Sequence, residues 1–167
     1  MSHESHNHPS QIVPYEGAAT GVGGNVRDVM CMGAEVIACT DSFRFGEIQR
    51  NKTKWIHDGV VSGVAGYGNP LGVPNIGGDL YYHKGYNENC LVTLVTLGII
   101  REDHIIHSYA PKSANGHDLI LIGKPTDNSG FGGASFASVE LEENEKEKNK
   151  GAVQEPNAFL ERHLLKS

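Results

Sequence analysis

The sequence lacks the features that mark membrane, secreted and nucleic-acid-binding proteins. The longest apolar run, residues 91–100, is about half a membrane span, and the N-terminus contains no apolar signal region. A net charge of −6 and the absence of a basic stripe argue against duplex nucleic acid as a partner. We therefore expect a cytoplasmic protein that binds neither membrane nor nucleic acid.

Cysteine is scarce, whereas glycine is abundant. The three cysteines are odd in number and set among apolar residues, which indicates reduced thiols rather than a disulfide framework or a zinc site. The 21 glycines follow no Gly-X-Y period, which excludes collagen, and their clusters indicate places where the backbone closely approaches another group. Neither the GxxxxGK[ST] loop nor the full dinucleotide fingerprint occurs, so an ordinary nucleotide kinase or an NAD enzyme is unsupported.

The apolar pattern predicts more strands than helices, without the regular alternation of a doubly wound sheet. This favours an α+β fold. We expect strands at 35–39, 73–82, 90–100, 118–122 and 134–141, helices at 25–32 and 55–67, and glycine-rich loops at 17–24 and 126–133.

A run of mixed charges at 140–150 divides the chain near its end. Such a run is typical of a solvated linker, and the residues at 153–165 resume apolar helical spacing after it. We therefore expect one domain over residues 1–141, a charged linker over 142–151, and the start of a truncated second domain over 152–167.

The densest group of reactive side chains lies at the start of the chain. Alternation over residues 3–8 predicts that Glu4, His6 and His8 share one side of an extended segment that ends at Pro9. A carboxylate there could hold magnesium, and a histidine could move a proton near neutral pH. A Glu/His/His transition-metal site is an alternative, and Met1 to His3 could be the remnant of an expression tag.

A second candidate region is the run GAATGVGG followed by Asn25-Val26-Arg27-Asp28. A glycine loop that opens a helix would offer unpaired N–H groups to an anion. Arg27 in the first turn could bind phosphate through two hydrogen bonds, and Asp28 could hold a metal, although such loops are often only tight turns. Together the two regions predict a single pocket for a magnesium-bound phosphorylated ligand.

The order ESHNHPS, PYEGAATGVGG and VRDV resembles the signature of the PurL synthetase family, within the PurM/AIR synthase-like superfamily. The resemblance continues through MGAEVIACTDSFRFG and GFGGASFASVEL. It implies a fragment of a phosphoribosylformylglycinamidine synthase, inactive alone. It also implies a fold like the PurM N-terminal domain, with a mixed β-sheet and helices packed on one face.

Members of this family use ATP and ammonia to convert formylglycinamide ribonucleotide (FGAR) into the amidine, by way of a phosphorylated amide oxygen and with Mg²⁺. The resemblance implies that His6 is the catalytic proton acceptor and that Glu4 and Asp28 bind magnesium. The substrate-binding residues that it implies are Ser5, Asn7, His8, Arg27 and Gln154.

The resemblance also implies partners. These are a PurQ-type glutaminase that supplies ammonia, a PurS-type subunit, and a second copy of the chain in a homodimer formed through the sheet face. Two other functions remain open. One is a non-catalytic ligand-binding or assembly module of the same fold, and the other is a different phosphotransferase of the superfamily.

Overall fold

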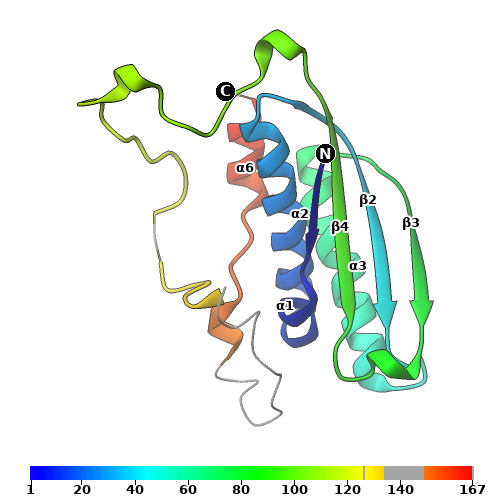
Figure 1. Ribbon diagram of the computed structural model, residues 1–167. Coiled ribbons are helices and arrows are strands. Elements are labelled where there is room, and N and C mark those ends of the chain that lie inside the picture. Colours follow the sequence, from blue (N-terminus) through cyan, green and yellow to red (C-terminus); the bar gives the residue numbers. More distant parts are fainter. Residues whose placement is uncertain (126, 134–148, 167) are drawn as a thin grey trace.

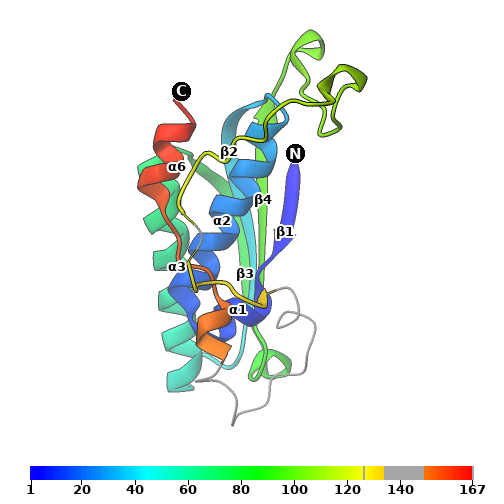
Figure 2. The same ribbon diagram turned by 90° about the vertical axis from the view of Figure 1, so that its left-hand side faces the viewer.

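A four-stranded mixed sheet with helices on one face forms the body of the molecule (Figures 1 and 2). The computed structural model describes residues 1–125, 127–133 and 149–166. The strands are β1 (Ser2–Ser5), β2 (Glu35–Phe45), β3 (Asn75–Tyr82) and β4 (Leu91–Ile99), and the helices are α1 (Asn7–Ile12), α2 (Pro14–Cys31), α3 (Asn51–Leu71) and α6 (Ala158–Leu164). Short 3₁₀ turns occupy Lys84–Tyr86, Glu102–His104, Lys112–Ala114 and Lys150–Ala152.

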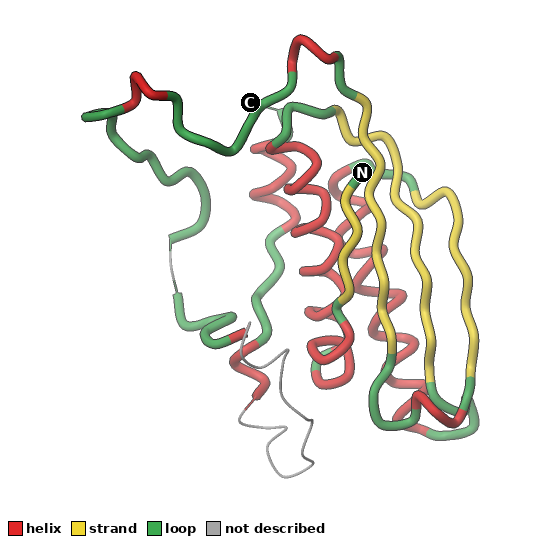
Figure 3. Tube along the Cα trace, in the orientation of Figure 1, coloured by secondary structure: helices red, strands yellow, loops and turns green. Residues whose placement is uncertain are grey.

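The strand order is β1-β4-β2-β3, in which β2 pairs parallel with β3 while both β1 and β2 pair antiparallel with β4. The expected α+β class, with a mixed sheet and helices on one face, is therefore confirmed (Figure 3). No helix in the described part of the chain is long and apolar enough to cross a membrane.

The core lies between the sheet and the helices. Alternate residues of β4 point inward, so that Val92 and Leu94 are buried. These two side chains belong to the same core cluster as Val26 of α2 and Val60 of α3. The buried Asn25 side chain donates to the backbone oxygen of Leu94 at 2.8 Å, which fixes α2 against β4. This packing brings α2 alongside the N-terminal strand, where the candidate residues lie.

The glycine-rich loop expected at 17–24 is wrong, because these residues lie inside α2. Their backbone has no positive φ angle, so glycine is needed here for space and not for a turn. A Cβ on Gly17 would lie 2.5 Å from the backbone of Ser10, and one on Gly23 would lie 2.5 Å from the Tyr67 ring. Arg27 is consequently one turn from the end of a long helix, rather than in the first turn of a short one.

Several other expected boundaries differ from the structure. The extended N-terminal segment ends at Ser5, so His8 lies in the short helix α1 and not in a continuing strand. The helix expected at 55–67 runs from Asn51 to Leu71, passing Pro70, and Gly72 ends it with a φ of 75°. The loop expected at 126–133 is confirmed for 127–132, which form a bend followed by turns.

The strand expected at 118–122 is wrong. Residues 119–122 make no ladder with the four-stranded sheet, and their side chains are 72–103% exposed. Apolar, β-branched composition alone does not make a strand, since a strand needs a partner for its backbone. The strand expected at 134–141 and most of the charged linker at 142–151 lie outside the described residues.

Candidate functional site

His6 is held at the junction of β1 and α2. Its backbone N–H donates to the Val92 oxygen at 2.8 Å, and its Nδ1 donates to the Gly17 oxygen at 2.8 Å. A carbonyl oxygen can only accept, so this contact assigns the hydrogen to Nδ1. The other ring nitrogen, Nε2, lies 2.9 Å from Oε1 of Glu4. The imidazole therefore has a fixed orientation, with a carboxylate beside the nitrogen that can exchange a proton.

Glu4 and Asp28 lie along the same seam between β1 and α2. A Cβ on Gly24 would lie 3.3 Å from Oε2 of Glu4, while the Ser2 hydroxyl donates to Oδ2 of Asp28 at 3.3 Å. Gly24 and Asp28 are one helical turn apart on α2, roughly 5 Å along its axis. Glu4 and Asp28 therefore border the same side of this helix.

A cavity of about 690 Å³ opens beside His6. It gathers most of the predicted substrate-binding residues, since its walls come from the N-terminal motif, from the glycines at 130–133 and from the segment before α6. Its lining comprises Glu4, Ser5, His6, Asn7, His8, Pro9, Thr20, Gly130, Gly132, Gly133, Ala152, Val153 and Gln154. The Asn7 side-chain oxygen also accepts the Val92 N–H at 2.8 Å, which fixes the start of α1.

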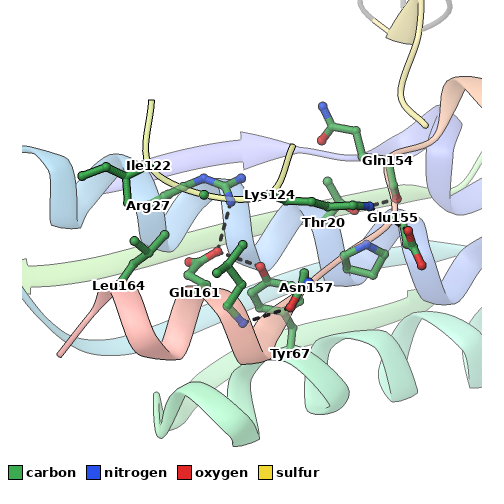
Figure 4. A pocket seen from close by; sticks show the side chains of 13 residues that line it. Thr20, Arg27, Tyr67, Ile122, Lys124, Gln154, Glu155, Asn157, Glu161 and Leu164 are labelled. Carbon is green, nitrogen blue, oxygen red and sulfur yellow. Dashed lines mark hydrogen bonds and ion pairs between the residues drawn. The ribbon is translucent and has the colours of Figure 1, made fainter. Parts of the chain in front are cut away.

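Arg27 lies in a second, smaller cavity of about 270 Å³ (Figure 4). Thr20 and Gln154 line both cavities, and the Thr20 hydroxyl donates to the Gln154 backbone oxygen at 3.2 Å. The sequence predicted a single pocket, whereas the structure places these residues in two adjoining cavities with this contact between them. Asp28 lines neither cavity.

Gln154 reaches both cavities because a turn packs closely against it. Gly130 has a φ of 73° and donates to the Gly151 oxygen at 3.1 Å. A Cβ at Gly130 would lie 2.4 Å from Cγ of Gln154, so only glycine fits here. The second glycine-rich segment therefore supports the position of a predicted substrate-binding residue.

Glu161 and Tyr67, which also line the smaller cavity, were not among the site residues predicted from the sequence. Glu161 of α6 is 1% exposed, and its Oε2 accepts from the Tyr67 hydroxyl at 2.7 Å and from Nη1 of Arg27 at 3.2 Å. Burial raises the pKa of Glu161, although the contacts with Tyr67 and Arg27 oppose that shift. A glutamate in a short amphipathic helix is normally solvated, so only its tertiary contacts show that it is buried.

Carboxylates such as Glu4, beside His6, and Asp28, on α2, suit magnesium better than a transition metal. Within residues 1–125, 127–133 and 149–166, no group of three or more His, Cys, Asp and Glu side chains is arranged to hold a metal ion. Magnesium usually takes one or two protein carboxylates and completes its shell with water and phosphate oxygens. Glu4 on β1 and Asp28 on α2 are carboxylates of this kind, and their hard oxygen donors match that ion in chemistry.

Comparisons of the sequence and of the structure with known proteins point to the same family. Residues 1–100 match the model of the AIR synthase related protein, N-terminal domain. The PurL subunit of phosphoribosylformylglycinamidine synthase from Methanothrix thermoacetophila is 54% identical over 172 aligned residues, covering 100% of this chain and 22% of that protein. The chain therefore spans about a fifth of the length of this curated relative.

Solved structures agree with the family match. The structure of T. maritima PurL complexed with FGAR is similar with a TM-score of 0.81 at 37% identity, covering 99% of this chain and 25% of that one. T. maritima PurL complexed with ATP and the structure of PurLQS from Thermotoga maritima each cover 66% of this chain and 18% of theirs, at 45% identity with TM-scores of 0.60 and 0.59. The chain belongs to the AIR synthase related family through its N-terminal domain, and its similarity to PurL extends over its whole length.

Proposed function

We propose that this chain is part of a phosphoribosylformylglycinamidine synthase, which converts FGAR into formylglycinamidine ribonucleotide with ATP and with ammonia from glutamine. The observation that carries the proposal is the pair of adjoining cavities, with a histidine–carboxylate pair in one and an arginine in the other. The complex of the similar T. maritima protein with FGAR supports the same ligand for this chain.

The shape of the two cavities suits an elongated ligand with different chemistry at its ends. FGAR carries a phosphate at one end and the reactive amide at the other. Arg27 offers a planar fork of donors that matches a phosphate, while His6 and Glu4 border the larger cavity where the amide would lie. Thr20 and Gln154 line both cavities, so they would contact the middle of such a ligand.

His6 is suited to accept a proton as ammonia attacks the activated amide. Because Nδ1 is bonded to the Gly17 oxygen, Nε2 is the nitrogen that takes up the proton. Glu4 Oε1, 2.9 Å away, would then stabilise the positive charge on the ring. Ser5, Asn7 and His8 share the wall of the same cavity and would orient the substrate around this pair.

Magnesium-bound ATP would supply the phosphoryl group and neutralise its developing charge. In this chain, Glu4 and Asp28 are the residues that would hold the metal. Oε1 of Glu4 faces Nε2 of His6, which leaves Oε2, on the side of Gly24, for a cation. The binding of ATP by the similar T. maritima protein supports a nucleotide requirement for the parent enzyme.

We also propose partners for the parent enzyme. The PurLQS structure supports assembly with PurQ-type and PurS-type subunits. The outer face of the sheet carries no helix among the described residues (Figure 2), and β3 is exposed along its length, with Tyr81 61% exposed. We therefore expect the chain to self-associate through this face. Size-exclusion chromatography at rising protein concentration measures this self-association. A chain that stays strictly monomeric at high concentration would contradict the expectation.

The proposed ligand contact is tested by replacing Arg27. Isothermal titration of FGAR into the chain should give an affinity about 10- to 100-fold weaker for Arg27→Ala, because the phosphate loses charge-assisted hydrogen bonds. Arg44→Ala is the matched control, since Arg44 pairs with Asp79 on the outer face of the sheet at 2.8 Å. Unchanged binding in Arg27→Ala would reject the phosphate site. No binding of FGAR by the unaltered chain would favour a non-catalytic assembly module.

A further inference from the structure

A buried carboxylate lies directly beneath Arg27. Glu161 comes from α6, Tyr67 from α3 and Arg27 from α2, and their side chains meet on the wall of the smaller cavity (Figure 4). The two side chains of the ion pair differ sharply in exposure, since that of Arg27 is 47% exposed and that of Glu161 is 1% exposed. The reaction proposed above assigns no role to Glu161 or to Tyr67.

We propose that Glu161 is a positioning residue for Arg27: with Tyr67 it holds the guanidinium at the cavity wall and thereby sets the affinity for the ligand's phosphate. The inference rests on the proposed function, in which Arg27 binds that phosphate. In this role Glu161 does not touch the ligand phosphate itself. It determines how the phosphate-binding side chain of Arg27 is presented.

Arg27 needs such support because of its place in the fold. It lies near the end of α2, where no free backbone N–H groups are available to help bind an anion. A long, half-exposed arginine samples many rotamers and must lose that freedom when it binds a ligand. The contact of Nη1 with Glu161 restricts the side chain beforehand, and it uses one of the five N–H donors of the guanidinium.

Tyr67 reduces the free-energy cost of burying the Glu161 carboxylate. Burial raises the pKa of the Tyr67 hydroxyl, which therefore stays protonated and donates to Oε2 of Glu161 at 2.7 Å. The second oxygen, Oε1, is buried and has no hydrogen-bond partner among the described residues. A contact that served only to join α6 to α3 would not need a charge with an unpartnered oxygen, because an apolar pair of similar size would pack there at lower cost.

A second contact of α6 provides a control for variants that only weaken the packing of α6 against α3. Arg162, the next residue of α6, donates from Nη1 to the Leu71 backbone oxygen at the end of α3, at 2.5 Å. It joins α6 to α3 without touching Arg27. Removing either side chain weakens the docking of α6, but only removal of Glu161 releases the guanidinium.

The test is titration of FGAR into the full chain and its variants. We expect Glu161→Ala to bind about 10-fold more weakly, and Tyr67→Phe about 3-fold, because Arg27 is less well held. Glu161→Gln should stay within about 3-fold of the unaltered chain, since its amide oxygen still accepts from both donors. Arg162→Ala should bind FGAR normally. Circular dichroism spectra confirm that each variant is folded.

The double variant Arg27→Ala/Glu161→Ala separates positioning from a structural role. It should bind no more weakly than Arg27→Ala, because Glu161 acts only through Arg27. Normal binding by Glu161→Ala, or equal weakening by Glu161→Ala and Arg162→Ala, would overturn the inference while the Arg27 site still stands. If Arg27→Ala itself binds FGAR normally, the proposed function fails instead.

Discussion

Replacing His6 by alanine should lower kcat for formylglycinamidine ribonucleotide formation by about 10²- to 10⁴-fold in a family-length synthetase that carries this chain. The bond from Nδ1–H to the Gly17 oxygen fixes the ring, so Nε2 is oriented to accept a proton, which it then donates to Oε1 of Glu4, 2.9 Å away. Alanine removes that acceptor, and water cannot replace it with the same geometry. The rate at saturating ammonia and FGAR is the quantity to measure.

Binding should change much less than turnover in the His6 variant. In the proposed site Arg27 would still contact the phosphate from the second cavity, so the dissociation constant for FGAR should stay within about 3-fold. His117→Ala is the control, because this histidine is exposed and lies outside both cavities. A variant that retains kcat and loses only affinity would show that His6 binds substrate without moving a proton.

Replacing Gly17 by alanine should have the largest effect on stability. The new Cβ would lie 2.5 Å from backbone atoms of Pro9 and Ser10, which cannot rotate away as a side chain would. Separating α1 from α2 would also stretch the contact between the Gly17 oxygen and His6. We expect a loss of about 3 kcal/mol in the free energy of unfolding, measured by urea denaturation, despite the better helix propensity of alanine.

Gly24 is the matched control within the same helix. A Cβ there would approach only Oε2 of Glu4, at 3.3 Å, and that carboxylate can shift. Gly24→Ala should therefore stabilise the chain by up to about 1 kcal/mol, as expected for a half-buried helical position where the new Cβ meets only the end of a flexible side chain. If both alanine variants were equally mild, residues 17–24 would behave as the loop that the sequence indicated and not as the middle of α2.

Much of the sheet could be predicted because its strands follow a simple pattern. The run at 90–100 is rich in β-branched residues and forms β4, and the apolar run at 35–39 begins β2. Alternation also placed Glu4 and His6 near each other, and the structure joins them through a hydrogen bond. Local periodicity was sufficient for these features, since each is set by neighbours in the chain.

The remaining features depend on tertiary contacts that no local pattern reveals. Glycines normally indicate a turn, but those at 17, 21 and 23 allow α2 to approach α1, β4 and α3. Leu119 and its neighbours have strand composition without a partner strand. Glu161 has the local pattern of a solvated residue, yet it is buried where α6 packs on α3 and α2, with Oε2 bonded to Tyr67 and Arg27. In each case packing outweighs intrinsic propensity.

A crystal structure of the chain with FGAR bound would test the central claim most directly. The claim predicts the phosphate within hydrogen-bonding distance of the Arg27 guanidinium, the formyl amide beside His6, and the ribose passing the contact between Thr20 and Gln154. A ligand confined to the larger cavity, with Arg27 bonded only to Glu161, would contradict it.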